Sequence, residues 1–380
     1  MNVGSYIYEQ GAWSAPFDAS LDSQNSLIVL FADQSEAAIQ ERISDVRAVY
    51  AYAIIVGAST AGEIFGGAFH EKACVVLVMQ FERTIIKSAF LPLRSVETSF
   101  EDGAMLARKL HDDHLKAVFV LSDGLNVNGS QLTKGMASIV GNTIPVTGGL
   151  AGDGNRFLKT WIVVNDTAKN HYVGGIGFYG NTIHFAYASK GGWDSLGLQR
   201  IVTKSRNNVL YELDHKPALE IYKKYLGDKA TGLPATGLLF PLELQENGDT
   251  HETKVRTILA INEQEQSITF AGDIPEGSSV TLMKANFDRL IQGASDAAES
   301  IRLEPHTTEP LVSIAISCVG RRLVLKSRIE EELEAVLEAL PPQCHQIGFY
   351  SYGEISPLRS GVCDLHNQTM TLTLLWESSV

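Results

Sequence analysis

The sequence lacks the marks of several protein classes. Its 380 residues hold only four cysteines and no Cys-x-x-Cys pair, so neither a structural zinc site nor a disulfide framework is indicated. No segment approaches the roughly 20 apolar residues that cross a bilayer, and the N-terminus lacks the basic and apolar regions of a secretory signal. We therefore expect a cytoplasmic protein that holds no metal and no cofactor.

Basic residues are in the minority. The chain has 31 Lys and Arg against 44 Asp and Glu, a net charge of −13. A nucleic acid or an anionic membrane would not be attracted to such a surface, so neither is expected as a partner. Hydrophobic residues make up 44% of the chain, and a chain of this length usually forms more than one core, so two domains are expected.

A strand, helix, strand, acidic turn, strand pattern occurs three times. The middle of each unit is an apolar run that ends in glycine followed by an acid, at 54–64, 144–153 and 346–355. Each is preceded by an apolar run and a segment with one apolar stripe at helical spacing, and is followed by another apolar run. The repeat predicts an α/β fold with mixed sheets.

The pattern changes between the second and third units. Short runs separated by turn residues, among them 238–244, 255–262, 267–272 and 278–283, predict antiparallel strands. The glycine-containing segment 191–197 is the expected link between two lobes. We place the domain division after residue 205, giving domains 25–205 and 206–380.

Seven motifs carry a resemblance to a known family. In chain order they are GASTAGEI, VTGGLAGDG, ELDHKPALEIY, VRTILAIN, SCVGRR, FYSYGEISP and LHNQT. Together they resemble the paired N- and C-terminal domains of the FIST family over about residues 25–377. The resemblance implies that 25–205 and 206–380 are the FIST N-terminal and C-terminal domains. It also implies an intracellular sensory role in signal transduction, with a small ligand, an amino acid or related metabolite, as the signal.

The turns after the strands are the expected place for that ligand. Ligands of sheets with parallel strands collect beyond the carboxyl ends, where the loops diverge. Glycines there let backbone N–H groups approach a ligand, and Glu63, Asp153 and Glu354 can accept hydrogen bonds from an ammonium group. Arg321 offers a planar fork suited to a carboxylate.

The third turn has the richest surroundings. Tyr350, Tyr352 and Glu354 alternate along a strand end and so share a face, and His366 and Asn367 return in the following loop. The predicted ligand-binding residues are Ser59, Thr60, Glu63, Gly149, Asp153, Cys318, Arg321, Tyr350, Tyr352, Glu354, His366 and Asn367.

Other interpretations stay open at this point. The Gly-acid turns can be structural, with each carboxylate accepting nearby backbone N–H groups. Cys318 with His366 or His345 and an acid has the residue types of a thiol hydrolase, although no catalytic residue is assigned. The chain can also be a pure interaction module that uses the acidic side of helix 326–340, with Glu330, Glu331, Glu332 and Glu334, to dock a separate signalling output protein.

Overall fold

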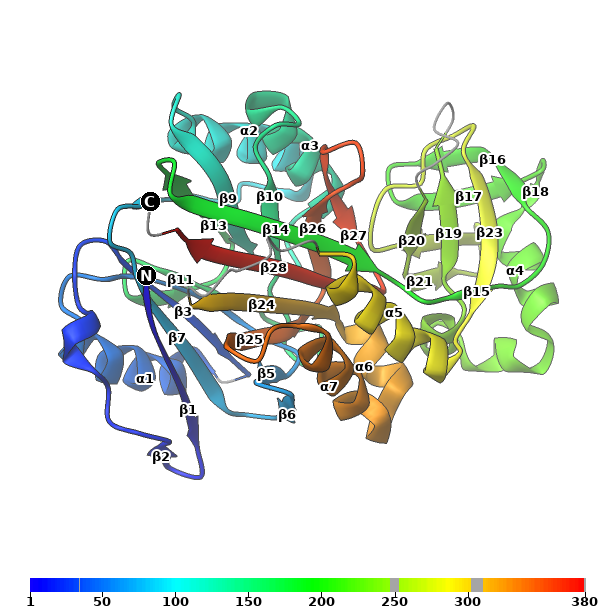
Figure 1. Ribbon diagram of the computed structural model, residues 1–380. Helices are drawn as coiled ribbons and strands as arrows, with labels where there is room; N and C mark the ends of the chain where they lie inside the picture. The colour runs from blue at the N-terminus through cyan, green and yellow to red at the C-terminus, as the bar shows by residue number, and fades with distance from the viewer. Residues whose placement is uncertain (34, 247–252, 302–309, 379–380) are drawn as a thin grey trace.

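The computed structural model describes residues 1–33, 35–246, 253–301 and 310–378. It confirms the α/β class with mixed sheets. Three sheets and their helices form a body that contains both termini, and a fourth, antiparallel sheet forms a lobe to one side (Figure 1). We call residues 194–284 the antiparallel lobe.

Each sheet of the body is built on one of the three predicted units. In every unit two parallel strands flank a helical connection, and a third strand pairs antiparallel with the first of them. An additional strand that precedes the unit then lies beside this third strand. The helices cover the outer faces, because their apolar stripes need a surface to bury.

The elements of the units have these bounds. Unit 1 holds β1 (Asn2–Glu9), β2 (Ala12–Trp13), β3 (Ser26–Ala32), α1 (Glu36–Val49), β4 (Ile54–Ser59) and β7 (Cys74–Gln80). Unit 2 holds β8 (Ile85–Pro92), α2 (Ser99–Leu110), β9 (Leu115–Ser122), α3 (Gly129–Val140), β10 (Val146–Leu150) and β13 (Tyr172–Tyr179). Unit 3 holds β14 (Ile183–Lys190), α5 (Phe287–Glu299), β24 (Leu311–Cys318), α6 (Val319–Leu325), α7 (Ile329–Ala339), β25 (Cys344–Ser351) and β28 (Met370–Glu377).

The units exchange hairpins in a closed cycle. After its acidic turn, each unit sends a short hairpin to a neighbouring sheet. The hairpin of unit 1 pairs with β25 of unit 3, that of unit 3 with β10 of unit 2, and that of unit 2 with β4 of unit 1. These hairpins are β5 (Glu63–Phe65) with β6 (Ala68–His70), β26 (Gly353–Pro357) with β27 (Cys363–His366), and β11 (Ile162–Val164) with β12 (Thr167–Lys169).

One apolar core lies where the three sheets meet. It contains inward-facing side chains from all three units, such as Val29, Phe119 and Ile314. The rings of Phe31 and Phe349 lie 4.5 Å apart between units 1 and 3. Strands from both sides of position 205 pair with each other in this body, as β5 does with β25. The division into domains 25–205 and 206–380 stays a prediction.

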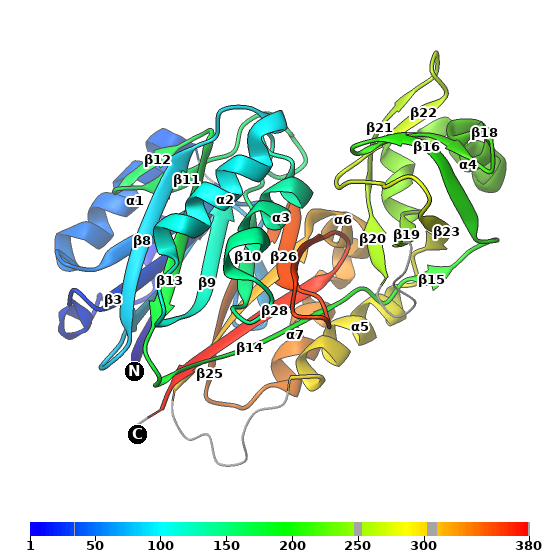
Figure 2. The same ribbon diagram turned by 90° about the horizontal axis from the view of Figure 1, so that it is seen from above.

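The antiparallel lobe is an insertion in unit 3. The chain leaves β14, enters the lobe through residues 191–193 of the predicted link, and returns through α5 (Figure 2). The lobe holds α4 (Ala218–Leu226), β15 (Asp194–Ser195), β16 (Arg200–Arg206), β17 (Val209–Leu213), β18 (Lys216–Pro217), β19 (Leu242–Gln245), β20 (Lys254–Arg256), β21 (Ile258–Asn262), β22 (Ser267–Phe270) and β23 (Ser279–Lys284). Short 3-10 helices are η1 (Ala19–Leu21), η2 (Val96–Thr98), η3 (Gly227–Gly232), η4 (Ala235–Leu239) and η5 (Lys326–Arg328).

Candidate functional site

The three Gly-acid turns meet one another. Gly152 N donates to Ser59 O at 2.9 Å, Tyr352 N donates to Leu150 O at 3.2 Å, and Ala61 N donates to a carbonyl of the third turn at 2.7 Å. The turns therefore form a closed ring of backbone contacts at the point where each chain segment passes from its own sheet to a neighbour's. The predicted residues Ser59, Thr60, Gly149, Tyr350 and Tyr352 lie in or next to this ring and are buried.

The carboxylates of units 1 and 3 have equivalent hydrogen bonds. Glu63 accepts from the Thr60 hydroxyl and, at 3.1 Å, from Ala73 N. Glu354 accepts from Ser351 Oγ at 2.7 Å and from the backbone and hydroxyl of Thr369 at 3.2 and 2.9 Å. Burial raises the pKa of each carboxyl to about 8, although the hydrogen bonds act in the opposite direction. The carboxylates of Glu63 and Glu354 therefore both have hydrogen-bond partners within the protein.

The carboxylate of unit 2 closes its own loop. Asp153 accepts from the backbone N–H groups of Phe157, Leu158 and Lys159 at 2.8–2.9 Å, and from the Tyr352 hydroxyl. The Tyr352 ring stacks on Phe157 with 4.5 Å between centroids. These contacts match the open interpretation of a structural acidic turn.

Arg321 lies in a buried ion pair. Its side chain is 0% exposed and lies 2.5 Å from Glu332, which also accepts from Tyr350 Oη at 2.9 Å. The guanidinium donates to Leu290 O at 2.7 Å and to the carbonyl of Gly191. The prediction that Glu332 faces solvent with its neighbours on the helix is therefore wrong, because its carboxylate neutralises a buried guanidinium.

Cys318 is buried where β24 passes into α6. Its side chain belongs to the core, and burial raises the pKa of the thiol well above its ordinary value, with the nearby Glu354 acting in the same direction. The reactive form of cysteine is the thiolate. The surroundings of Cys318 therefore disfavour the form that a nucleophile requires.

His366 and Asn367 lead from the third turn to a cavity. His366 Nε2 lies 3.1 Å from Ser356 O, and burial lowers the pKa of the imidazole. Asn367 Nδ2 donates to the His366 carbonyl at 3.0 Å, while its buried Oδ1 has no hydrogen-bond partner within the described residues. Of the twelve predicted residues, His366 borders the cavity and the other eleven do not.

The cavity lies between the body and the antiparallel lobe and has a volume of about 530 Å³. We call it the interlobe cavity. The body contributes β14, the following glycines, and the ends of β26 and β27, while the lobe contributes β19, β20 and β23. Its lining residues are Tyr187, Ala188, Ser189, Lys190, Gly191, Gly192, Trp193, Glu243, Thr253, Lys254, Val255, Met283, Ser300, Pro357, Leu358, Arg359, His366 and Thr369.

Three charged side chains of this lining are unpaired. Within the described parts of the chain, Lys190 and Arg359 have no ion pair or hydrogen bond through their side chains, and neither has Glu243. Lys254 is different, since it pairs with Asp364 of the body and lies 2.7 Å from Glu246. The Trp193 indole is fixed by a 2.9 Å hydrogen bond to Gln368 O. The cavity thus offers charges of both signs and a rigid aromatic wall.

Polar contacts hold the lobe against the body beside the cavity. Asp273 of the lobe accepts from Asn128 Nδ2 at 2.9 Å and from Gln131 Nε2 at 2.5 Å, and lies 3.3 Å from Lys134 Nζ. Arg256, 1% exposed, donates to Leu365 O of β27 at 3.1 Å. These contacts set the distance between the cavity walls.

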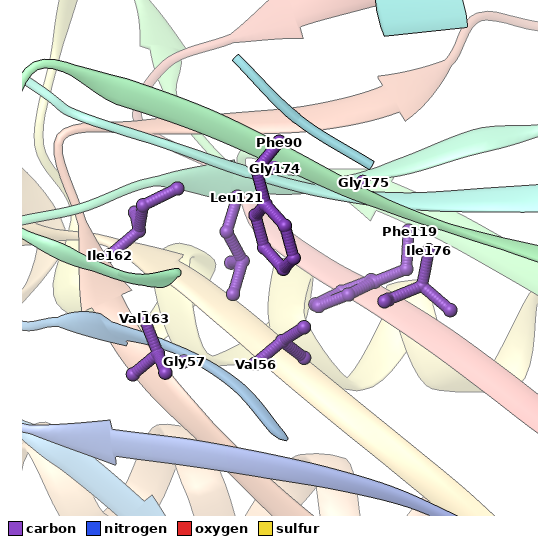
Figure 3. A pocket seen from close by; sticks show the side chains of 10 residues that line it. All are labelled: Val56, Gly57, Phe90, Phe119, Leu121, Ile162, Val163, Gly174, Gly175 and Ile176. Carbon is purple, nitrogen blue, oxygen red and sulfur yellow. The ribbon is translucent and has the colours of Figure 1, made fainter. Parts of the chain in front are cut away.

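Two other spaces fit a ligand less well. A space lined by apolar side chains of units 1 and 2, including Val56 and Phe119, has a volume of only about 10 Å³, about that of one water probe (Figure 3). A second, of about 390 Å³, lies beside Asp123 and Lys159. There Asp123 accepts from the backbone of Leu125 and His171, and Lys159 pairs with Glu36, so its charged groups are already engaged.

The described residues contain neither a metal-binding cluster nor a membrane-spanning helix. None of their His, Cys, Asp and Glu side chains form a group of three or more that could hold a metal ion. No helix among them is both long enough and apolar enough to cross a membrane.

Sequence reasoning missed the residues that give the cavity its charge. Lys190, Glu243 and Arg359 belong to no recognisable motif, and they come together only because the lobe folds back beside unit 3. The one available signal was the predicted link at 191–197, which borders the cavity. Whether the twelve predicted residues bind a ligand stays a prediction.

The comparisons with known proteins agree with the resemblance seen in the motifs. Residues 26–216 match the FIST N domain and residues 218–357 match the FIST C domain. The chain is also 26% identical over 372 residues to a protein of Methanocaldococcus jannaschii named "Uncharacterized protein MJ1623", with 86% of this chain and 68% of that protein covered. FIST domains are sensory domains of signal-transduction proteins that bind small ligands. The chain belongs to the FIST family.

Proposed function

We propose that this FIST protein senses an amino acid or a related metabolite that binds in the interlobe cavity, in the cytoplasm. The observation that carries the proposal is the set of unpaired charges in the lining, with Lys190 and Arg359 on the body and Glu243 on the lobe. Lys190 and Glu243 are partly buried, and an unpaired charge that is partly removed from water is costly unless a ligand or solvent compensates it. A zwitterion compensates both signs at once.

The chemistry of each wall suits one end of such a ligand. The planar guanidinium of Arg359 can bind a carboxylate through two hydrogen bonds, and Lys190 adds a second positive charge. The carboxylate of Glu243 accepts hydrogen bonds from an ammonium group. Trp193, held by its hydrogen bond to Gln368 O, provides an apolar surface for the rest of the ligand.

The position of the cavity provides a way to signal. A ligand that contacts Arg359 on the body and Glu243 on the lobe binds best at one separation of the two, so it favours that arrangement over others. A separate output protein that recognises the favoured arrangement would then receive the signal. The remaining acidic side chains of α7, Glu330, Glu331 and Glu334, are a candidate docking surface for it.

A ligand screen tests the proposal. We expect an amino acid or related metabolite to raise the unfolding midpoint, because a ligand selective for the folded state stabilises it by mass action. Arg359→Gln and Glu243→Gln should each weaken binding, measured by calorimetry, by about tenfold or more, the range of a lost charge-assisted hydrogen bond. Millimolar solutions of all the compounds without any shift in midpoint would overturn the proposal.

Matched variants provide the control. Arg206 and Glu220 are exposed residues of the lobe with no side-chain partner in the described chain. Arg206→Gln and Glu220→Gln change the net charge by the same amount as the cavity variants and should leave the dissociation constant unchanged. Equal losses in cavity and control variants would point to a general effect of charge and would remove the interlobe cavity from the proposal.

A further inference from the structure

The lining of the interlobe cavity contains consecutive residues of strands. Tyr187, Ala188, Ser189 and Lys190 of β14 all border it, and so do Lys254 and Val255 of β20 and the preceding Thr253. Successive side chains of a strand point to opposite faces of the sheet. A cavity against one face would therefore be lined by every second residue, whereas a cavity along the edge of a strand is lined by every residue.

Both strands lie at the edge of their sheets. β14 pairs with β28 on one side, and β20 pairs with β19, and neither has a second neighbouring strand among the described residues. In an antiparallel edge strand, every second residue points its backbone N–H and C=O away from the ladder. The cavity is thus bordered by two rows of backbone donors and acceptors, one from the body and one from the lobe.

The charges of the cavity are distributed over its two walls. Lys190 and Arg359 belong to the body, and Glu243 lies on β19, opposite Val255 in the ladder of the lobe. The Cα atoms of Tyr187 and Lys190, the first and last lining residues of β14, are about 10 Å apart at the usual rise of a strand. A single amino acid has too few backbone groups to pair along an edge of this length, whereas an extended ligand of several residues can follow it.

From this geometry we propose that the ligand is a short peptide with a free C-terminus, bound in extended form as an added strand on the edge of β14. Its carboxylate lies at Lys190 and Arg359, and its chain extends from there along β14 toward Tyr187. Its backbone N–H and C=O groups pair with those of β14, a recognised mode of peptide binding. The inference rests on the proposed function, whose site it shares, and narrows the metabolite to a peptide.

Backbone pairing along β14 distinguishes the binding of a peptide from that of a free amino acid. A free amino acid can meet Lys190 and Arg359 with its carboxylate, but it has no amide groups to pair along β14. A peptide of about three residues adds two amides and can pair with the edge while its carboxylate meets Lys190 and Arg359. Because the pairing uses main-chain groups, it tolerates many different side chains on the peptide. The Trp193 ring in the lining would favour a peptide with an apolar side chain.

The test compares four pools of compounds at equal total concentration: free amino acids, tripeptides of mixed sequence, the same tripeptides with amidated C-termini, and tripeptides methylated on their backbone nitrogens. We expect the plain tripeptides to raise the unfolding midpoint most and native mass spectrometry to retain a tripeptide mass on the full chain. Amidation and backbone methylation should each reduce affinity by about tenfold, the value of one lost charge-assisted or ladder interaction.

A variant links the effect to the site. Arg359→Gln changes an exposed side chain. In this variant the ratio of the affinities for plain and C-terminally amidated tripeptides should decrease at least several-fold. Arg206→Gln makes the same change at an exposed residue of β16 in the lobe and should leave this affinity ratio unchanged. Intrinsic fluorescence gives a second readout, because Trp193 lies in the lining and Trp193→Phe should remove a ligand-dependent change while the thermal shift remains.

The outcomes distinguish this inference from the proposed function. If free amino acids shift the midpoint as much as the tripeptides or more, the peptide inference fails and the proposed function stands. If methylated or amidated tripeptides bind as well as plain ones, pairing on β14 is excluded. If neither amino acids nor tripeptides shift the midpoint, both proposals fail.

Discussion

Glu63 and Glu354 show what a repeated acid does in this fold. Each is fully buried and accepts a hydroxyl hydrogen bond from the residue three positions before it, and then a backbone N–H at the start of the strand that completes its unit. The sequence allowed the acid and its turn to be predicted, because glycine followed by an acid after an apolar run is a local pattern. It did not reveal the burial, which depends on how the three turns pack together.

The buried carboxyls predict a pH dependence of stability. The pKa of Glu354 rises from 4.5 to about 8 in the folded protein, because burial disfavours the charged form. Its contribution to stability is then fully present below pH 4.5 and is lost as the pH rises through about 8. A single proton contributes a slope of at most about 1.4 kcal/mol per pH unit. Glu354→Gln should therefore make the decrease in unfolding free energy over this range less steep.

Urea unfolding at a series of pH values measures that slope. Glu63 has the same direction and size of pKa shift, so the Glu354→Gln protein should retain roughly half of the decrease that these two carboxyls cause. Glu220→Gln, at an exposed position on α4, is the control and should follow the wild type. A Glu354→Gln protein with the wild-type slope would show that this carboxyl does not carry the pH dependence.

At the scale of elements, one glycine in each unit lets two parallel strands come together. Gly57, Gly148 and Gly348 lie at equivalent places on β4, β10 and β25, and a Cβ on any of them would overlap the carbonyl oxygen of the residue opposite on the neighbouring parallel strand. The three predicted motifs contain these glycines, and the succession of strands and helix along each unit followed from the sequence. The exchange of hairpins did not, because it pairs strands that are far apart in the chain and no local pattern selects the partner.

Gly348→Ala tests this close approach. The methyl group has no room between β24 and β25, so we expect a loss of about 1–3 kcal/mol in the free energy of unfolding, the range for an overpacked core. Gly67→Ala is the matched control, since a Cβ there would have its nearest neighbour at an ordinary 3.5 Å. Thermal or urea unfolding measures both variants. Equal midpoints for the two would show that the strands can separate without cost.

At the scale of the whole molecule, the lobe and the body meet through polar contacts and through one small apolar cluster, in which Met283 of the lobe packs with Leu290 and Val324 of the body. Most other buried side chains of the lobe form their own cluster, apart from the two large clusters of the body. Sequence reasoning predicted two lobes and a link at 191–197, but not the surface on which the lobe rests, because Asp273, Arg256 and Asp364 lie in segments that look like ordinary turns and strands. The interlobe cavity depends on this surface, since its walls come from both sides.

Asp273→Ala should loosen the lobe. The change leaves the side chains of Asn128, Gln131 and Lys134 on α3 without the acceptor that they share, and hydrogen bonds to a charged group each contribute about 1.5–3 kcal/mol. Amide hydrogen exchange should therefore become faster at the start of α3 and at residues 271–274, while the core strands of each unit keep their protection. Ligand affinity should decrease as well, because the two walls no longer have a fixed separation.

Asp113→Ala removes the same charge from an exposed position on the body and should change neither exchange nor affinity. Faster exchange at α3 with unchanged ligand affinity would mean that the ligand contacts one wall only. Unchanged exchange at both segments would mean that Asp273 does not hold the lobe, and that the remaining contacts, among them those of Arg256, the Lys254–Asp364 pair and the apolar cluster around Met283, are sufficient. Because loss of affinity is expected only if a ligand spans the cavity, the two measurements together separate docking of the lobe from recognition of the ligand.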